Sequence, residues 1–147
     1  MMDNQQVLSD VKQFITINVN EEYYGIDISY INSIERMQKI TRVPKAQSYF
    51  TGIINLRGEI VPVMSLRRKI GLEDDVFDKK TRIIIMKLEP KYSIGIIVEN
   101  VLEVITLGKE NIEKAVTEDD SSSYVYGIGK HEDKLISLLD VEKVILD

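Results

Sequence analysis

The side chains that most often perform catalysis are scarce in this sequence. It has no cysteine and a single histidine, His131. The lack of cysteine excludes disulfides, thiolate metal sites and cysteine nucleophiles, and one histidine cannot form a histidine metal cluster. His131 lies in the polar stretch 129–134, where a solvated turn residue is the expected state. The serine run 121–123 lacks the glycine pattern that surrounds a serine nucleophile.

Two acidic runs are candidates for binding a cation. The first contains Asp74, Asp75 and Asp78, and the second spans residues 118–120. Neither has the alternating oxygen ligands and central glycine of a calcium-binding loop, so we interpret both as solvated charge. We therefore expect no metal, no cofactor and no catalytic residue. We also expect the purified protein to be a monomer without hydrolase or transferase activity.

Length and composition indicate one soluble globular domain. The chain has 147 residues, of which 44% are hydrophobic and 29% charged. Its 19 basic and 24 acidic residues give a net charge of −5, which argues against binding to duplex nucleic acid. The sequence has no apolar run of membrane-spanning length and no signal-peptide pattern at its start. These features predict a cytoplasmic protein.

Alternating apolar residues predict that the first part of the chain is made of strands. Residues 1–10 are polar and are interpreted as a leader. Residues 14–19 fit a half-buried strand, and a turn at 20–22 leads to a second strand over 23–28. From Ile28 onward the apolar residues are spaced by three, which predicts a helical turn followed by a strand.

A second hairpin has the clearest local signal. Residues 51–56 and 59–64 are predicted strands, and Gly58 supplies the positive φ that a tight turn needs. Pro62 has no backbone N–H, so its strand should have a free side there. Ser65 is a plausible N-cap for a short helix.

The remainder of the chain continues as strands with polar connections. After a charged connector over 71–80 and before a polar loop over 117–123, apolar patterns predict two further strands, and two more follow the loop. Asp140 is a plausible cap for a C-terminal helix over 141–146. The predicted later strands are 82–88, 93–98, 124–130 and 134–139.

The sequence also resembles itself. Residues 52–70 align without a gap over 127–145, and residues 24–34 align over 94–104. Only three pairs in the longer window are identical, but the apolar positions and both helix caps coincide. Two explanations remain open: a chance likeness between hairpins of similar length, or two related β-units that each close into a small barrel.

The tip of the second hairpin is chemically unusual. The order Asn-Leu-Arg-Gly over residues 55–58 places a large apolar residue and a cation where Asn-Gly or Asp-Gly is common. Such a tip suggests a surface that contacts another protein. An ordinary solvated arginine is the alternative interpretation.

These residues resemble the CheW family of chemotaxis coupling proteins. The resemblance is carried by Tyr24-Gly-Ile-Asp-Ile28, by Thr41-Arg-Val-Pro44 and above all by Gly52-Ile-Ile-Asn-Leu-Arg-Gly-Glu-Ile-Val-Pro62. It covers the chain from about Phe14 to Leu146. It implies a mainly β fold, in which two SH3-like five-stranded β-barrel subdomains are related by internal duplication, with short helices and a C-terminal helix. Within one CheW-like domain over 1–147, the expected parts are 12–78, 79–139 and 140–147, with soft, intertwined boundaries.

The same resemblance implies a non-enzymatic adaptor that couples chemoreceptors to the histidine kinase CheA. Its implied partners are the CheA regulatory domain and the cytoplasmic receptor tip, without nucleic acid or direct membrane contact. The chain would reach membrane-associated receptor arrays through those partners. The alternatives are a CheW-like scaffold in a two-component signalling array outside chemotaxis and, more remotely, a small enzyme.

The resemblance also implies which residues meet each partner. In the family the receptor surface lies in the groove between the two barrels, and the kinase surface lies on the first barrel. The implied receptor-binding residues are Glu35, Arg57, Ile28, Ile31 and Val98; the implied kinase-binding residues are Ile40, Thr41, Arg42, Val43 and Pro44; and the implied structural turn residues are Asn55, Gly58 and Gly52.

Overall fold

The computed structural model describes residues 11–88, 92–114 and 124–146. The expected leader, the connection at 89–91 and the polar loop over 117–123 lie outside the described residues. The described chain divides into two compact units. Unit 1 contains residues up to Ile17, then Glu21–Ser29 and the chain from Leu102 onward, and unit 2 contains Asn18–Asn20 and Tyr30–Val101.

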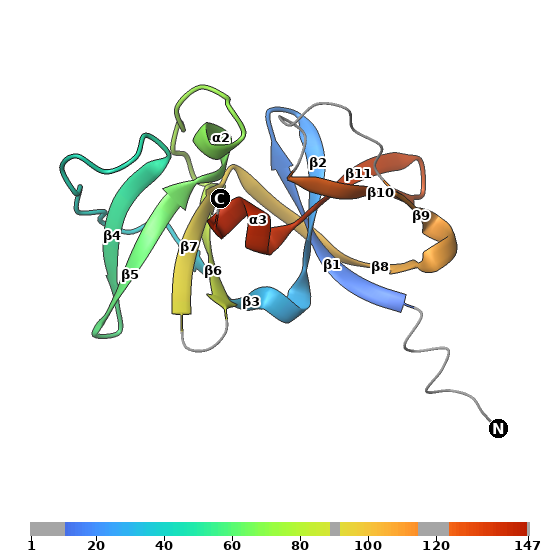
Figure 1. Cartoon of the computed structure of the whole chain (residues 1–147), viewed down its shortest axis with the longest axis horizontal. Helices are drawn as coiled ribbons and strands as arrows, with labels where there is room; N and C mark the ends of the chain where they lie inside the picture. The colour runs from blue at the N-terminus through green and yellow to red at the C-terminus, as the bar shows by residue number, and fades with distance from the viewer. Residues whose placement is uncertain (1–10, 89–91, 115–123, 147) are drawn as a thin grey trace. The chain divides into compact units, whose positions relative to one another are not determined.

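Unit 2 is built on a five-stranded sheet (Figure 1). All of its predicted strands are present. The sheet mixes antiparallel hairpins with one parallel pair, β5 and β7. The strand order is β3 (Ile31–Arg36), β6 (Arg82–Leu88), β7 (Tyr92–Val98), β5 (Glu59–Ser65) and β4 (Phe50–Leu56).

A six-stranded sheet forms most of unit 1. It also contains one parallel pair, in which β2 lies beside β11. The strand order is β8 (Asn100–Gly108), β1 (Val11–Val19), β2 (Glu22–Asp27), β11 (Lys134–Leu139), β10 (Val125–His131) and β9 (Ile112–Lys114). The helices of the described chain are short: η1 (Ile28–Tyr30), α2 (Leu66–Lys69), η2 (Lys109–Asn111) and α3 (Val141–Leu146).

The two units differ from the expected segments 12–78 and 79–139. The cause is the parallel pair between β2 and β11, in which Tyr24 lies opposite Ser137 and Gly25 opposite Leu138. This pairing joins the two ends of the chain in one sheet. Unit 1 is therefore discontinuous in sequence.

Strand register favours duplication over chance likeness. Gly52 lies opposite Val63 in unit 2, and Gly127 lies opposite Leu138 in unit 1, each 75 residues later. A shift in register precedes the glycine in both hairpins. The parallel partners correspond as well, since Val63 lies opposite Gly95 and Leu138 lies opposite Gly25.

The correspondence extends to the sheet edge. In unit 1, β9 pairs with β10 and places Glu113 opposite Ile128. In unit 2 the same place is taken by a single bridge between Thr41 and Ile53. The two units therefore share one topology, and the sixth strand of unit 2 is reduced to this bridge. The fold is mainly β and consistent with two SH3-like subdomains.

Each unit has its own apolar core. In unit 2 the core cluster consists of Ile54, Leu56, Val61, Val63, Ile83, Ile85 and Ile97. In unit 1 it consists of Phe14, Ile105, Leu107, Ile136 and Leu138.

The expected half-buried first strand is wrong, because β1 is buried on both faces along Phe14–Ile17. Thr16 is buried there, and its hydroxyl is hydrogen-bonded. It donates to the Glu103 carbonyl at 3.0 Å and accepts from the Glu103 N–H at 3.2 Å.

The short-range predictions around the helices are confirmed. The Ser65 hydroxyl accepts from the Arg68 N–H at 3.2 Å and caps α2. Asp140 Oδ1 accepts from the Lys143 N–H at 3.2 Å and caps α3. The free side expected at Pro62 also exists, because the ladder from β5 to β7 begins only at Val63.

Candidate functional site

The β4–β5 turn fixes the direction of the Arg57 side chain. Arg57 and Gly58 both adopt positive φ, 51° and 87°, as a two-residue turn compatible with strand twist requires. Asn55 Oδ1 accepts from the Gly58 N–H at 2.9 Å and closes the turn. Gly58 was expected to have positive φ. Arg57 was not, because this backbone region is uncommon for residues with a Cβ.

Glu35 and Arg57 meet in the structure. Arg57 Nη2 lies 3.2 Å from Glu35 Oε2. Glu35 is on β3 and Arg57 follows β4, and these strands are the two edges of the five-stranded sheet. Contact between opposite edges requires the sheet to curl, so the pair and the Thr41–Ile53 bridge together bring its edges close.

The two charges are unequally exposed. The Arg57 side chain is 72% exposed and the Glu35 side chain 17%. Glu35 therefore holds one guanidinium nitrogen, and the remaining donors of Arg57 face solvent with no partner among the described residues. An arginine held in this way can bind a second carboxylate with two parallel hydrogen bonds.

The three apolar residues expected beside this pair lie in different places. Ile31 is partly buried at the start of β3, opposite Met86. Ile28 is partly buried in η1 and belongs to unit 1. Val98 is only 1% exposed at the end of β7. The expectation that it is a contact residue is therefore corrected, because its side chain packs inside and offers no surface to a partner.

The segment expected to bind the kinase is held on unit 2 by backbone hydrogen bonds and by apolar packing. Thr41 exchanges two backbone hydrogen bonds of 2.8 Å with Ile53, and Ile40 packs against the unit 2 core cluster. Gly52 permits this approach, because a Cβ at that position would lie 2.3 Å from the Thr41 carbonyl oxygen. Among the five expected residues, Thr41, Arg42, Val43 and Pro44 are exposed and Ile40 is not.

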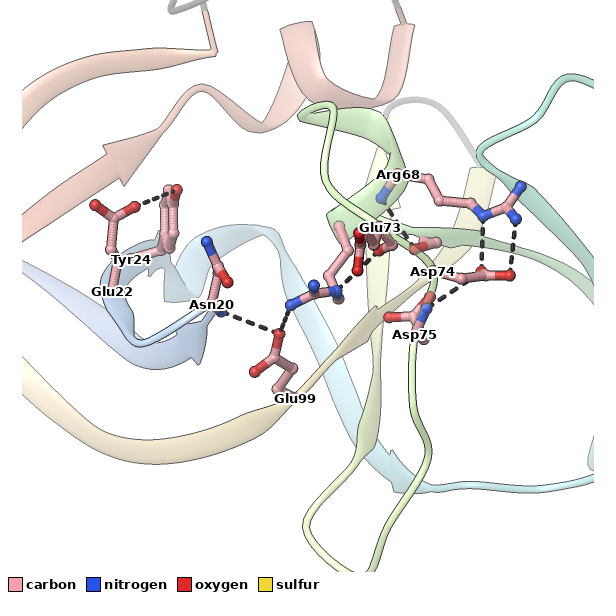
Figure 2. Close-up of polar contacts among 10 residues, drawn as sticks. Asn20, Glu22, Tyr24, Arg68, Glu73, Asp74, Asp75 and Glu99 are labelled. Atoms are coloured by element: carbon pink, nitrogen blue, oxygen red, sulfur yellow. Dashed lines mark hydrogen bonds and ion pairs between the residues drawn. The ribbon is translucent and has the colours of Figure 1, made fainter.

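Helix α2 carries an arginine network that the sequence did not predict. Arg68 donates from Nε and Nη2 to both carboxylate oxygens of Asp74, at 2.7 and 2.8 Å (Figure 2). It also donates from Nη1 to the Ser48 carbonyl at 2.6 Å. These bonds tie the connector after α2 to the body of unit 2. The charges of this connector are therefore partly engaged, where we expected solvated ones.

The other arginine of α2, Arg67, links three further segments of the chain. Arg67 forms an ion pair with Glu99 and donates from Nε to the Glu73 carbonyl at 2.9 Å. Glu99 also accepts from the Asn20 N–H at 3.0 Å (Figure 2). Two arginines in a short helix, followed four residues later by the acidic run that begins at Glu73, are the signal by which this network could have been found.

Two neighbouring carboxyls of the connector have pKa values that are shifted in opposite directions. The hydrogen bonds from Arg68 lower the pKa of Asp74 below its ordinary value. Burial raises the pKa of Asp75, against the opposing effect of a hydrogen bond from Ser65. The connector thus contains one carboxylate that the fold stabilises and one whose charge it disfavours.

The histidine and the acidic side chains of the described ranges form no metal centre. His131 Nε2 lies 3.5 Å from Glu132 Oε2, and the histidine side chain is 28% exposed rather than fully solvated. No group of three His, Asp or Glu side chains that could hold a metal ion is found in residues 11–88, 92–114 or 124–146. No helix of those ranges is long and apolar enough to span a membrane.

Comparison with known proteins decides the family. The CheW-like domain model matches residues 13–147. The chain belongs to the CheW family. It is 34% identical to the chemotaxis protein CheW of Helicobacter pylori, over 97% of this chain and 84% of that protein. It is 35% identical to CheW of Bacillus subtilis, over 91% and 86% of the two chains.

A solved structure supports the same assignment. The scaffolding protein TtCheW from Thermoanaerobacter tengcongensis has a TM-score of 0.80 to this fold, with 34% identity over 90% of this chain and 86% of that one. CheW proteins are chemotaxis adaptors and scaffolds rather than enzymes. The resemblance drawn from the hairpin motif is therefore confirmed, and so is the expected adaptor function.

Proposed function

We propose that this chain connects the cytoplasmic tip of chemoreceptors to the regulatory domain of CheA, and that it reaches membrane-associated arrays through these partners. The observation that carries the proposal is the Arg57–Glu35 pair. A 72% exposed arginine at a turn with positive φ is a costly arrangement for stability alone. It suits a cation that is displayed to a partner.

Reconstitution from three purified components tests the bridge. A receptor cytoplasmic fragment and the CheA regulatory domain are run together on size-exclusion chromatography with and without this chain. We expect all three in one peak when the chain is present, and separate peaks without it. If the receptor fragment and the kinase domain co-elute equally well without the chain, or if the chain binds neither, the proposal fails.

The receptor-facing side is proposed to contain Glu35 and Arg57, with Ile31 as apolar neighbour. The double variant Glu35→Arg, Arg57→Glu restores the ion pair with its direction reversed, so it separates loss of the pair from loss of the displayed cation. We expect Arg57→Glu to lose receptor binding, Arg57→Lys to retain an intermediate affinity and the double variant to recover part of the loss. Recovery to full affinity would show that only the pair, and not the outward cation, is needed.

The kinase-facing side is proposed to lie at residues 40–44, with Val43 as its exposed apolar anchor. Val43 is 41% exposed, and interface energy concentrates in a few such anchors. We expect Val43→Asp to weaken CheA binding by more than tenfold, or about 1.4 kcal/mol, without unfolding the protein. Val76→Asp is the matched control, because Val76 is 83% exposed in the same unit. Equal CheA affinities of both variants and the wild type would remove this placement.

A further inference from the structure

The segment around the proposed kinase contact is strongly basic. Residues 36–45 contain Arg36, Lys39, Arg42 and Lys45 and no acidic residue. Since the whole chain has a net charge of −5, the other residues carry −5 − 4 = −9. The four cations recur at every third residue, and all four are exposed.

The side chains of these four residues are available to bind an external partner. None of the four side chains takes part in an ion pair or hydrogen bond with the described part of the chain, although the backbone of Arg36 pairs with Arg82 in the sheet. Two acidic side chains near this segment already have partners. Glu35, which precedes Arg36 in the sequence, binds Arg57, and both oxygens of Asp74 bind Arg68. Arg42 does lower the pKa of Asp74, but it is the weakest of the causes.

The segment is held by the fold rather than by its own charges. Thr41 is bonded to Ile53, while Met37 and Ile40 pack against the unit 2 core cluster. Lys45 has a φ of 62°, and Pro44 before it has a fixed φ. Successive cations are separated by three residues, at most about 11 Å of chain, which is near the Debye length of about 8–10 Å. Their fields therefore overlap.

We propose that residues 36–45 form an electrostatic docking surface for an acidic protein face, with Val43 as the apolar anchor within it. The inference rests on the proposed kinase contact and adds the charge of the kinase surface that receives it, which must be acidic. Clustered cations of this kind act mainly on the rate of association, which they raise by about 10- to 1,000-fold.

A protein face fits better than a membrane or a nucleic acid. Two of the three large apolar residues of the segment, Met37 and Ile40, point into the core cluster, so only Val43 is left to insert. Four cations neutralise few phosphates, and the charge of −9 on the other residues would be repelled by an extended polyanion.

Association kinetics with the purified CheA regulatory domain test the proposal. The test variant combines Arg36→Gln, Lys39→Gln, Arg42→Gln and Lys45→Gln. Its matched control combines Lys109→Gln, Lys114→Gln, Lys130→Gln and Lys143→Gln, four exposed lysines of unit 1. Both variants change the net charge from −5 to −9, and thermal melting confirms that both are folded.

We expect the test variant to associate at least tenfold more slowly than the wild type at 50 mM salt, and the control to stay within twofold. Raising salt to 500 mM should slow the wild type and leave the test variant nearly unchanged. Equal rates for the two variants would overturn the docking surface while leaving the kinase contact intact. If the wild type does not bind CheA at all, the proposed function itself fails, and the docking surface with it.

Binding to vesicles containing 30% phosphatidylglycerol is measured with the same proteins. We expect none. Vesicle binding that the test variant loses, together with an unchanged CheA association rate, would assign the segment to the membrane surface and overturn the proposal.

Discussion

The tips of the β4–β5 and β10–β11 hairpins occupy equivalent places in the two units but have opposite chemistry. Arg57 and Glu132, 75 residues apart, both have positive φ, 51° and 56°. Arg57 reaches across its sheet to Glu35, whereas Glu132 pairs with its neighbour His131. The first turn residue therefore has positive φ in both units, whereas the second has it at Gly58 and not at Asp133. The tips read Leu-Arg-Gly in one unit and His-Glu-Asp in the other.

The difference separates folding from function. Because Glu132 turns the chain as well as Arg57 does, the hairpin does not need an arginine at this position. The neighbouring segments differ in the same way. Residues 108–114, which correspond to the basic segment of unit 2, contain two lysines and two glutamates. Among the described residues, a cationic tip beside a segment without acidic residues is thus found in unit 2 and not in unit 1, and unit 2 is where we place both partner surfaces.

The largest expected effect contrasts Gly52 and Gly127, the glycines that follow the register shifts in the two hairpins. A Cβ at Gly52 would lie 2.3 Å from the Thr41 carbonyl oxygen, whereas a Cβ at Gly127 would lie 3.1 Å from that of Glu113. We expect Gly52→Ala to lower the free energy of unfolding by about 2–3 kcal/mol and Gly127→Ala by about 1 kcal/mol or less. Urea unfolding measures both. Equal losses would show that the two edges are equally tight and break the comparison.

The next effect contrasts two arginines of unit 2. The Arg67 side chain is 17% exposed and joins Glu99 and Glu73, whereas that of Arg57 is 72% exposed. We expect Arg67→Met to cost about 1–2 kcal/mol of unfolding free energy and Arg57→Met about 0–1 kcal/mol. Melting and urea curves of the two variants check this. A larger loss for Arg57→Met would mean that the tip arginine serves the fold.

The smallest effect is a pH dependence in the connector. The folded pKa of Asp74 is lowered, so its contribution to stability is present above the unfolded pKa and is lost as pH falls through the folded pKa. The folded pKa of Asp75 is raised. Ionisation of Asp75 therefore lowers the stability of the fold as pH rises from its unfolded pKa to its folded pKa. At pH 7 we expect Asp74→Asn to be less stable than wild type and Asp75→Asn more stable.

Both differences should shrink at pH 3, near or below the ordinary aspartate pKa of 3.8. Urea unfolding at the two pH values gives four comparisons with wild type. Differences of the same sign for the two variants at pH 7 would contradict the opposite environments assigned to these carboxyls.

Local signals in the sequence predicted most of the elements. Gly58, Ser65 and Asp140 placed a turn and two helix caps correctly, because these residues act on their immediate neighbours. The discontinuous composition of unit 1 was not predictable in this way. The β2–β11 pairing joins residues more than 100 positions apart, and nothing in either strand specifies its partner.

The candidate site was predicted by resemblance and only in part by the residues themselves. The Leu-Arg-Gly tip was unusual on its own terms, but its link to Glu35 depends on the curl of a whole sheet. Val98 was misplaced because an apolar residue at a strand end has no local mark of its exposure. The α2 network was missed because Arg67 and Arg68 were considered apart from the acidic run that follows them.

The central claim is that the unit 2 tip, and not its unit 1 equivalent, binds the receptor. Charge reversal at the two tips tests it most directly: Arg57→Glu and Glu132→Arg are each titrated with a receptor cytoplasmic fragment by calorimetry. We predict at least a tenfold loss of affinity for Arg57→Glu, with a melting temperature within a few degrees of wild type, and unchanged affinity for Glu132→Arg. Wild-type affinity in a folded Arg57→Glu protein, or equal losses in the two variants, would contradict the account.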